Sequence, residues 1–228
     1  MSDVELEKRI VAREALKLVE GVEVLGLGSG STVAVFVEEL ARSDHAGRLL
    51  VIPSSSQIER VARGMGLRVV HPDEGRPELT VDGADEVDGE LNLLKGGGGA
   101  LLREKILALH SEVYVVIADH TKLVERLCSR RPLPVEVLPY GVSWTIDRLT
   151  KEMGCDAELR MAGGSRFVTD NGNLIVDLRC PPLDDPASVE RRIKLIPGVM
   201  EVGIFSNLAD CVLITIGAEV RRLGDCHF

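Results

Sequence analysis

The feature that most constrains this chain is a regular alternation of two kinds of segment over its first 120 residues. Short apolar, β-branched runs read as buried strands at 22–26, 49–52, 67–70, 79–81, 91–94 and 113–118. Segments with helical spacing of apolar residues separate them, at 33–41, 57–65 and 100–110. A further helix is expected before the first strand, where Ser2 and Glu5 have capping-box spacing. This alternation predicts a doubly wound, mostly parallel α/β sheet, that is, a Rossmann-like fold.

A different order of elements begins after residue 128, where Pro132 and Pro134 mark a boundary. Strands are expected at 135–138, 157–161, 174–178 and 199–204, helices at 143–153 and 185–194, and a turn at 170–173. The order β-α-β-β-α-β is that of a ferredoxin-like unit. The last apolar strand, 212–216, is expected to return to the first sheet. The sequence therefore predicts a Rossmann-like domain of residues 1–128 and 206–228, with a smaller α+β domain, 129–205, inserted before the last strand.

Composition excludes several classes of function. The 228 residues are 45% apolar, enough for a sizeable core, while 27 basic against 36 acidic residues give a net charge of −9. That charge, with only 3% aromatic residues, argues against nucleic-acid binding. No apolar run reaches the roughly 18–20 residues of a membrane helix, and the first residues lack a signal peptide's apolar stretch. A cytoplasmic protein without a membrane partner is expected.

The cysteines and histidines do not suggest a metal site. The five cysteines are odd in number, widely spaced and without a CxxC pair, and the five histidines lack metal-ligand spacing. Reduced thiols are expected rather than a disulfide framework or a zinc site.

The loops that follow the predicted strands hold the candidate functional residues. In Gly26–Thr32, glycines and the amides of the next helix suit an anion, and hydroxyls come from Ser29, Ser31 and Thr32 around Gly30. A glycine-rich tight turn without a ligand is the alternative. The serines at 54–56 favour a helix N-cap, with ligand contact left open.

A second loop, residues 81–88, places four acidic side chains within seven residues. Asp82 and Asp85 would accept substrate hydroxyls or move protons. Two alternatives are a divalent-cation loop, whose spacing does not match the calcium pattern, and a solvated acidic turn.

A third loop is a run of four glycines, Gly96–Gly99, preceded by Lys95 and followed by Glu104 in the next helix. Such a run loses much conformational entropy on ordering, which indicates a need for close backbone approach or a flexible loop. Glu104 could equally be a surface acid. Lys122 follows the strand at 113–118. Because ligands of open parallel sheets bind beyond the carboxyl ends of the strands, we expect these loops to meet at one cleft.

These motifs, in order along nearly the whole chain, resemble type A ribose-5-phosphate isomerase. The matching segments are GLGSGST (26–32), DGADE (82–86), KGGGGALLREK (95–105), PLPVEV (132–137), TDNGN (169–173) and IPGV (196–199). The resemblance implies interconversion of ribose 5-phosphate and ribulose 5-phosphate through an enediolate, within the pentose phosphate pathway, without metal or organic cofactor. It also implies a homodimer or homotetramer, formed through the smaller domain.

The resemblance assigns roles residue by residue. Glu104 would be the base, Lys95 would stabilise the enediolate with the glycine-loop amides, and Asp82 and Asp85 would bind hydroxyls and assist ring opening. The remaining substrate-binding positions would be Ser29, Gly30, Ser31, Thr32, Gly83, Ala84, Gly96, Gly97, Gly98 and Lys122. The sequence departs from the family where Ser29 is often threonine, Gly99 often alanine and Leu102 often threonine.

Three other functions are alternatives to isomerisation. A sugar-phosphate deaminase and a coenzyme A transferase would not explain why Lys95 and Glu104 flank the glycines. A non-catalytic sugar-phosphate sensor usually carries a DNA-binding segment, and the single amino-terminal helix and negative charge do not provide one.

Overall fold

A computed structural model describes residues 3–226, which form two compact units. Unit 1 comprises residues up to Ala84, Arg103–Lys122 and the segment from Asn207 onward; unit 2 comprises Asp85–Leu102 and Leu123–Ser206. The predicted domains divide the chain differently, because residues 85–102, 123–128 and 206 belong to unit 2. Ser2, and with it the predicted capping box, lies outside the described residues.

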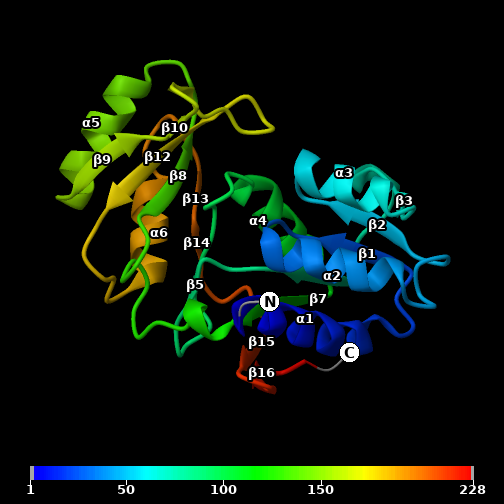
Figure 1. The fold of residues 1–228 in the computed structure, drawn as a ribbon. Coiled ribbons are helices and arrows are strands. Elements are labelled where there is room, and N and C mark those ends of the chain that lie inside the picture. Colours follow the sequence, from blue (N-terminus) through cyan, green and yellow to red (C-terminus); the bar gives the residue numbers. More distant parts are fainter. Residues whose placement is uncertain (1–2, 227–228) are drawn as a thin grey trace. The chain divides into compact units, whose positions relative to one another are not determined.

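Unit 1 is built on a seven-stranded sheet in the order β16-β15-β7-β4-β1-β2-β3 (Figure 1). All neighbouring strands in it are parallel except the pair β15–β16. Its strands are β1 (Val24–Leu27), β2 (Leu50–Pro53), β3 (Arg68–Val69), β4 (Leu79–Asp82), β7 (Val113–Asp119), β15 (Cys211–Ile216) and β16 (Glu219–Gly224). The predicted doubly wound fold is confirmed, and the order reverses between β1 and β4, where the ligands of such sheets bind.

Helices bury apolar faces against this sheet. They are α1 (Asp3–Leu16), α2 (Ser31–Ala41), α3 (Ser56–Gly64) and α4 (Leu101–His110), with 3-10 turns η1 (Lys17–Val19), η2 (Pro72–Glu74) and η3 (His120–Lys122). α1 packs along α2 and against β7 and β15, and Val11, Phe36 and Leu40 are fully buried in this core. α3 begins at an N-cap, since the Ser55 hydroxyl accepts from the N–H of Ile58 at 3.2 Å, as the serine pattern predicted.

Unit 2 contains the second predicted fold. Its four-stranded antiparallel sheet has the order β13-β8-β12-β9, with strands β8 (Leu133–Val137), β9 (Asp156–Leu159), β12 (Leu174–Arg179) and β13 (Val199–Val202). Two helices, α5 (Val142–Met153) and α6 (Pro186–Lys194), complete the β-α-β-β-α-β order. The predicted strand 91–94 was expected in the parallel sheet, but it forms β6 (Leu93–Leu94) of an antiparallel three-stranded sheet with β5 (Glu86–Val87) and β14 (Ile204–Phe205). A hairpin of β10 (Met161–Ala162) and β11 (Ser165–Arg166) is additional.

One buried carboxylate joins two distant segments of unit 2. Glu136 of β8 is fully buried, and its Oε1 accepts from Thr169 Oγ1 and from the side-chain amides of Asn171 and Asn173 at 2.8–3.0 Å. The turn at 169–173 is thereby tied to the sheet, and Gly172 supplies its positive φ of 77°.

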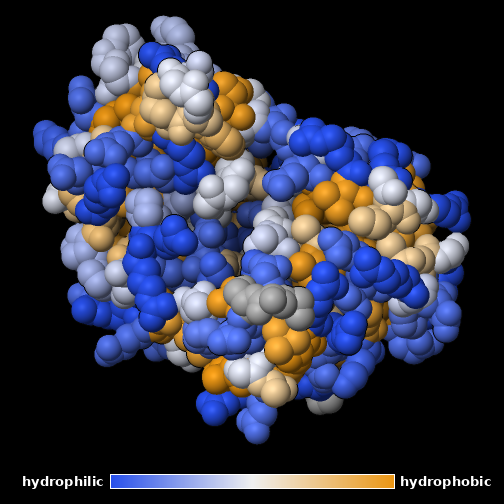
Figure 2. All heavy atoms as spheres, viewed as in Figure 1, coloured by the Kyte–Doolittle hydropathy of each residue, from blue (hydrophilic) through white to orange (hydrophobic). Residues whose placement is uncertain are grey.

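Large apolar side chains are exposed on unit 2. Leu138, Tyr140 and Trp144, at the end of β8 and in α5, expose 41%, 80% and 71% of their surface. Figure 2 shows apolar atoms gathered around α5 at the upper left. Exposed aromatic side chains close together are typical of a surface that another molecule covers.

The expectation of free cysteines was wrong for four of the five. Cys155 and Cys180 form one disulfide and Cys211 and Cys226 a second, with Cα atoms 5.2 and 5.0 Å apart. Each pair is separated in sequence, so a count and a search for CxxC motifs could not reveal it. Cys128 remains a thiol, and burial, with the nearby Glu86 charge, raises its pKa to about 12.

The disulfide between Cys211 and Cys226 should stabilise the protein because it closes a loop across the β15–β16 hairpin. Replacing both cysteines with serine should lower the free energy of unfolding by about 2–3 kcal/mol. In a chain of this size each kcal/mol corresponds to about 2–4 °C of melting temperature. Calorimetry with and without reductant measures this. Reductant should lower the melting temperature of the parent protein more than that of the double variant. Equal melting of the two proteins without reductant would contradict a stabilising role.

Candidate active site

A buried carboxylate organises the switch point of the unit 1 sheet. Asp82, the last residue of β4, is fully buried. Its Oδ1 accepts from the backbone N–H groups of Gly83 (2.7 Å) and Ser29 (3.2 Å), and its Oδ2 accepts from the Tyr114 hydroxyl at 2.9 Å. The loops after β1 and β4 and the buried tyrosine of β7 thus meet at one side chain.

Two glycines of the first loop are required by close packing against β4, which the sequence did not reveal. A Cβ on Gly28 would lie 1.8 Å from Asp82 Oδ1, and a Cβ on Gly26 would lie 1.9 Å from Thr80 Oγ1. These glycines therefore let side chains of β4 approach β1, and the approach of a ligand to this loop stays a prediction. Gly30, with φ of 98°, is the residue at which the chain turns into α2.

Hydroxyl groups line the same loop. The Ser29 hydroxyl lies 2.8 Å from that of Ser54 and 2.9 Å from that of Ser55. Ser31 and Thr32 form the first turn of α2, with Ser31 exposed and Thr32 buried. Ser55 also caps α3, so both interpretations of the serine segment, capping and contact with the site, involve it.

Glu104 lies in the first turn of α4 and is 4% exposed. Its charge acts on Tyr114: burial, then the charges of Asp82 and Glu104, raise the pKa of the tyrosine well above its ordinary value. Tyr114 therefore stays protonated and donates its hydrogen bond. The alternative of Glu104 as a surface acid is wrong, because its side chain is buried.

The remaining candidate residues of unit 1 are Lys122, Gly83 and Ala84. Lys122 ends η3, directly after β7, and is half-buried. Gly83 and Ala84 follow Asp82, with Gly83 buried. These residues all follow the carboxyl ends of strands, as predicted.

The second group of site residues lies in unit 2. Lys95 is 3% exposed, with its Nζ 5.5 Å from the centre of the Phe205 ring, and its backbone N–H donates to Gly203 O at 2.8 Å. Asp85 Oδ2 accepts from the N–H of Gly97 at 2.7 Å. Gly97 and Gly98 are exposed and Gly96 is buried with φ of 102°. The meeting of both groups at one cleft stays a prediction of the sequence.

The other two acids of the second loop are structural. Glu86 accepts from the N–H groups of Cys128, Arg130 and Arg131 at 2.6–2.8 Å. Asp88 accepts from Glu90 and Asn92, which closes a turn. The four carboxylates are therefore separately satisfied by N–H or O–H donors, which explains how so many like charges are tolerated in one loop.

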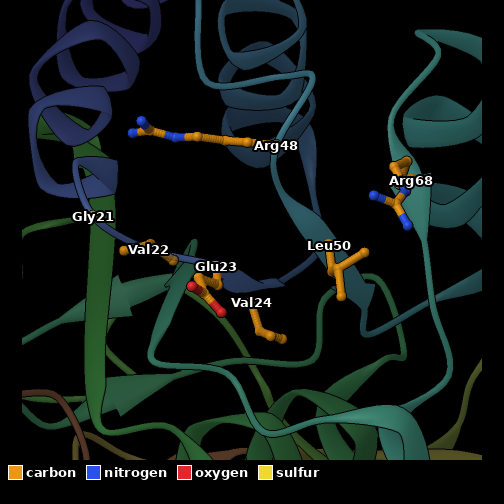
Figure 3. Close-up of a pocket in the computed structure, with 7 residues that line it drawn as sticks. All are labelled: Gly21, Val22, Glu23, Val24, Arg48, Leu50 and Arg68. Carbon is orange, nitrogen blue, oxygen red and sulfur yellow. The ribbon is translucent and has the colours of Figure 1, made fainter.

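A cavity of about 420 Å³ lies at the opposite, amino-terminal end of β1, β2 and β3 (Figure 3). Arg48 and Arg68 extend from two of its sides, and the other lining residues are Gly21, Val22, Glu23, Val24 and Leu50. It contains no candidate residue, since the candidates follow the carboxyl ends of the strands.

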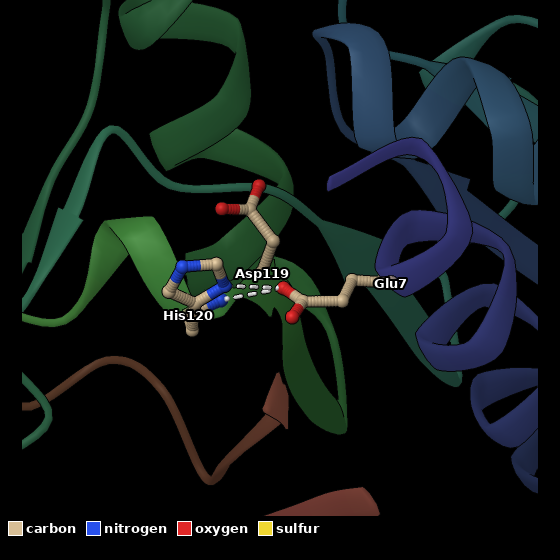
Figure 4. Close-up of side chains that lie close together, drawn as sticks. All are labelled: Glu7, Asp119 and His120. Atoms are coloured by element: carbon tan, nitrogen blue, oxygen red, sulfur yellow. Dashed lines mark hydrogen bonds and ion pairs between the residues drawn. The ribbon is translucent and has the colours of Figure 1, made fainter. Parts of the chain in front are cut away.

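Glu7, Asp119 and His120 form a polar cluster beside η3 (Figure 4). Each offers a possible metal ligand, with these atoms within 4.8 Å of one another. Glu7 is already engaged, however: its Oε2 contacts His120 Nδ1 at 2.6 Å and accepts from the His120 N–H, while its Oε1 accepts from Gly217 N at 2.8 Å. The cluster joins α1 to the segment that carries Lys122.

The hydrogen bonds of this cluster shift the pKa values of Glu7 and His120. Burial alone would raise the pKa of Glu7, but the bonds from His120 and Gly217 outweigh it and lower that pKa. The bond to Glu7 raises the pKa of His120. A lowered carboxyl pKa stabilises the fold above about pH 4.5, and a raised histidine pKa stabilises it below about pH 6.5. The Glu7–His120 pair should therefore stabilise the folded protein most between about pH 4.5 and about pH 6.5, and less as pH rises through the pKa of His120.

Replacing Glu7 with glutamine should lower the pKa of His120, because the amide removes the negative acceptor. The pKa follows from an NMR titration of the His120 ring, with the exposed His71 as an internal control that should not move. An unchanged His120 pKa would show that Glu7 does not govern its protonation.

Fold and side chains together define a doubly wound α/β protein with buried carboxylates and hydroxyl donors at its switch point, the arrangement of an enzyme for a small polar substrate. The family model for ribose 5-phosphate isomerase A (phosphoriboisomerase A) matches residues 50–218. The chain belongs to this family, which confirms the resemblance.

Relatives and solved structures agree. The ribose-5-phosphate isomerase A of Korarchaeum cryptofilum is 68% identical over 220 residues, covering 96% of this chain and 98% of its own. That of Pyrococcus horikoshii is 39% identical, covering 97% and 99%. A solved D-ribose-5-phosphate isomerase in complex with phospho-erythronic acid superposes with a TM-score of 0.93 at 39% identity, covering 99% and 100%. Within residues 3–226, none of the helices combines the length and apolarity needed to cross a bilayer.

Proposed function

We propose that this protein interconverts D-ribose 5-phosphate and D-ribulose 5-phosphate through an enediolate, as an aldose–ketose isomerase. The observation that carries the proposal is the buried carboxylate of Glu104, held in the first turn of α4 in a chain of this family. The relative solved with phospho-erythronic acid binds a phosphorylated acid with a planar carboxylate, a shape close to that of an enediolate.

The reaction needs a base and a stabiliser of negative oxygen. Glu104 removes the proton from C2 of the open-chain aldose, the C–H electrons form the C1–C2 double bond, and the C1 oxygen becomes negative. Glu104 then returns the proton to C1, while the C2 hydroxyl passes its proton to the negative C1 oxygen and its C–O bond becomes the carbonyl, which gives the ketose. A positioned base contributes about 10²- to 10⁴-fold to such a step.

The other candidate residues bind and stabilise. Lys95 is 3% exposed, so the attraction of its ammonium for the enediolate oxygen is screened little by water, and the glycine-loop N–H groups add donors. Asp82 and Asp85 bind hydroxyls and assist ring opening. The residues Ser29–Thr32 and Lys122 contact the substrate on its phosphate side. No step here requires a metal or organic cofactor.

A direct assay of ribose 5-phosphate conversion, with and without a chelator, tests the activity. Replacing Glu104 with glutamine should lower kcat at least ~10²-fold with little change in KM, since the amide keeps the shape but cannot accept the proton. Exchange of the substrate C2 proton with solvent deuterium should fall equally. Glu112→Gln, an exposed acid just beyond α4, is the matched control and should keep wild-type rates.

Lys122→Ala provides the contrast. Loss of a phosphate-side cation should mainly raise KM, whereas a fall in kcat alone would contradict the assignment. Near-normal turnover of the Glu104→Gln variant would remove Glu104 from the role of base.

We also propose that the protein is a homodimer or homotetramer joined through unit 2, and that it acts in the cytoplasm within the non-oxidative pentose phosphate pathway. The exposed Leu138, Tyr140 and Trp144 support a covered surface there, because burying such side chains is worth about 25 cal/mol per Å².

Light scattering should therefore give a mass of two or four chains for the parent protein. Trp144→Glu should shift it toward one chain, whereas Leu109→Glu, at an exposed apolar residue of α4, should not. A parent protein that is monomeric at micromolar concentration would contradict the proposal.

A further inference from the structure

The carbonyl groups of the glycine loop are held by a single guanidinium. Arg160 directly follows β9, and its Nη1 donates to Gly96 O at 2.8 Å and to Gly97 O at 3.0 Å. Its Nε donates to Asp177 Oδ2 at 2.8 Å, and its Nη2 donates to the other oxygen of Asp177. All of these contacts lie within unit 2, and the Arg160 side chain is 15% exposed.

The guanidinium is itself fixed by its surroundings. Asp177 lies on β12, beside β9 in the sheet, so the ion pair is anchored to regular structure. The Phe167 ring lies 5.7 Å from the guanidinium carbon, and the Phe167 N–H donates to Arg160 O at 2.9 Å. Arginine can hold this arrangement because its planar fork donates in several fixed directions at once.

The same cluster also packs against the end of the glycine run. A Cβ on Gly99 would lie 2.4 Å from Phe167 Cε1, and Gly99 has φ of 78°. An alanine at position 99 would therefore require the Phe167 ring to move. Gly96, Gly97 and Gly99 all contact the cluster of Arg160, Phe167 and Asp177.

Holding the carbonyls sets the direction of the N–H groups. A peptide unit is planar and trans, so its C=O and the next residue's N–H point in opposite directions. Fixing Gly96 O therefore orients the N–H of Gly97, and fixing Gly97 O orients the N–H of Gly98. The first of these donates to Asp85, one of the candidate site residues. Donation from a cation to a carbonyl also polarises the peptide and strengthens its N–H as a donor.

We propose that Arg160 is a positioning residue for the isomerisation: it holds the Gly97 N–H on Asp85 and orients the Gly98 N–H toward the negative oxygen of the enediolate. This inference rests on the proposed function. Arg160 acts through the peptide units of the glycine loop, and its ion pair with Asp177 fixes the guanidinium to the sheet of unit 2.

The test is Arg160→Lys, which keeps the charge but removes the fork. One ammonium cannot hold both carbonyls and both oxygens of Asp177 in the same geometry, so kcat should fall about 10- to 100-fold. KM should change less than about threefold, because ground-state binding does not depend on oxyanion donors. The inhibition constant of phospho-erythronic acid should rise with the loss in kcat/KM. That of ribitol 5-phosphate, which lacks a planar carboxylate, should not.

Arg179→Lys is the matched control. Arg179 also lies on β12 and pairs through Nε and Nη2 with Glu158 of β9, so it forms an arginine–carboxylate pair across the same two strands. Its replacement should leave kcat unchanged. Asp177→Asn, which keeps Arg160 but loosens its anchor, should lower kcat in the same direction as Arg160→Lys.

The outcomes separate the two proposals. A wild-type protein without isomerase activity would overturn the proposed function and this inference together. An active wild type with unchanged kcat in the Arg160→Lys variant, or with equal loss in the Arg179→Lys control, would overturn the positioning role alone. A fall in kcat confined to Arg160→Lys and Asp177→Asn, at unchanged melting temperature, would support it.

Discussion

The buried carboxylate of Asp82 is the interaction on which unit 1 depends at its switch point. A charge without water needs donors close by, and Asp82 has them from Ser29, Gly83 and Tyr114. Those donors come from the ends of β1 and β4 and from β7, so one side chain sets the spacing of three strands. The requirement for glycine at position 28 follows, because a Cβ there would collide with the carboxylate.

The same interaction reaches the candidate base. The Tyr114 hydroxyl donates to Asp82, and burial, then the charges of Asp82 and Glu104, raise the pKa of this tyrosine. A tyrosine that stays protonated remains the donor of this hydrogen bond. In unit 2 the corresponding device is a set of fixed peptide planes: Arg160 holds the carbonyls of the glycine loop, and Asp85 accepts from one of its N–H groups.

Much of the fold could be predicted because apolar periodicity is local. The strands 113–118 and 212–216 and the helix 100–110 appear within a residue or so of their predicted bounds, as β7, β15 and α4. β16 was missed, since its sequence Glu219–Gly224 alternates around charged residues on an edge strand rather than forming an apolar run. The disulfides were missed for a different reason: pairing depends on Cα atoms about 5 Å apart, which no local pattern encodes.

The sequence by itself determined the order of strands and helices, the family, and the residue types available for proton transfer, because these depend on periodicity and on motifs that are contiguous in the chain. Only the tertiary structure showed which segment each acid of residues 82–88 holds. Asp82 and Asp85 accept from the loops that carry other candidate residues, whereas Glu86 accepts from residues 128–131 and Asp88 closes its own turn. The tertiary structure also placed Arg160 on the carbonyls of a loop more than sixty residues away. The physical reason is that hydrogen bonds and burial depend on distance in space. Segments far apart in the sequence come close together only when the chain folds.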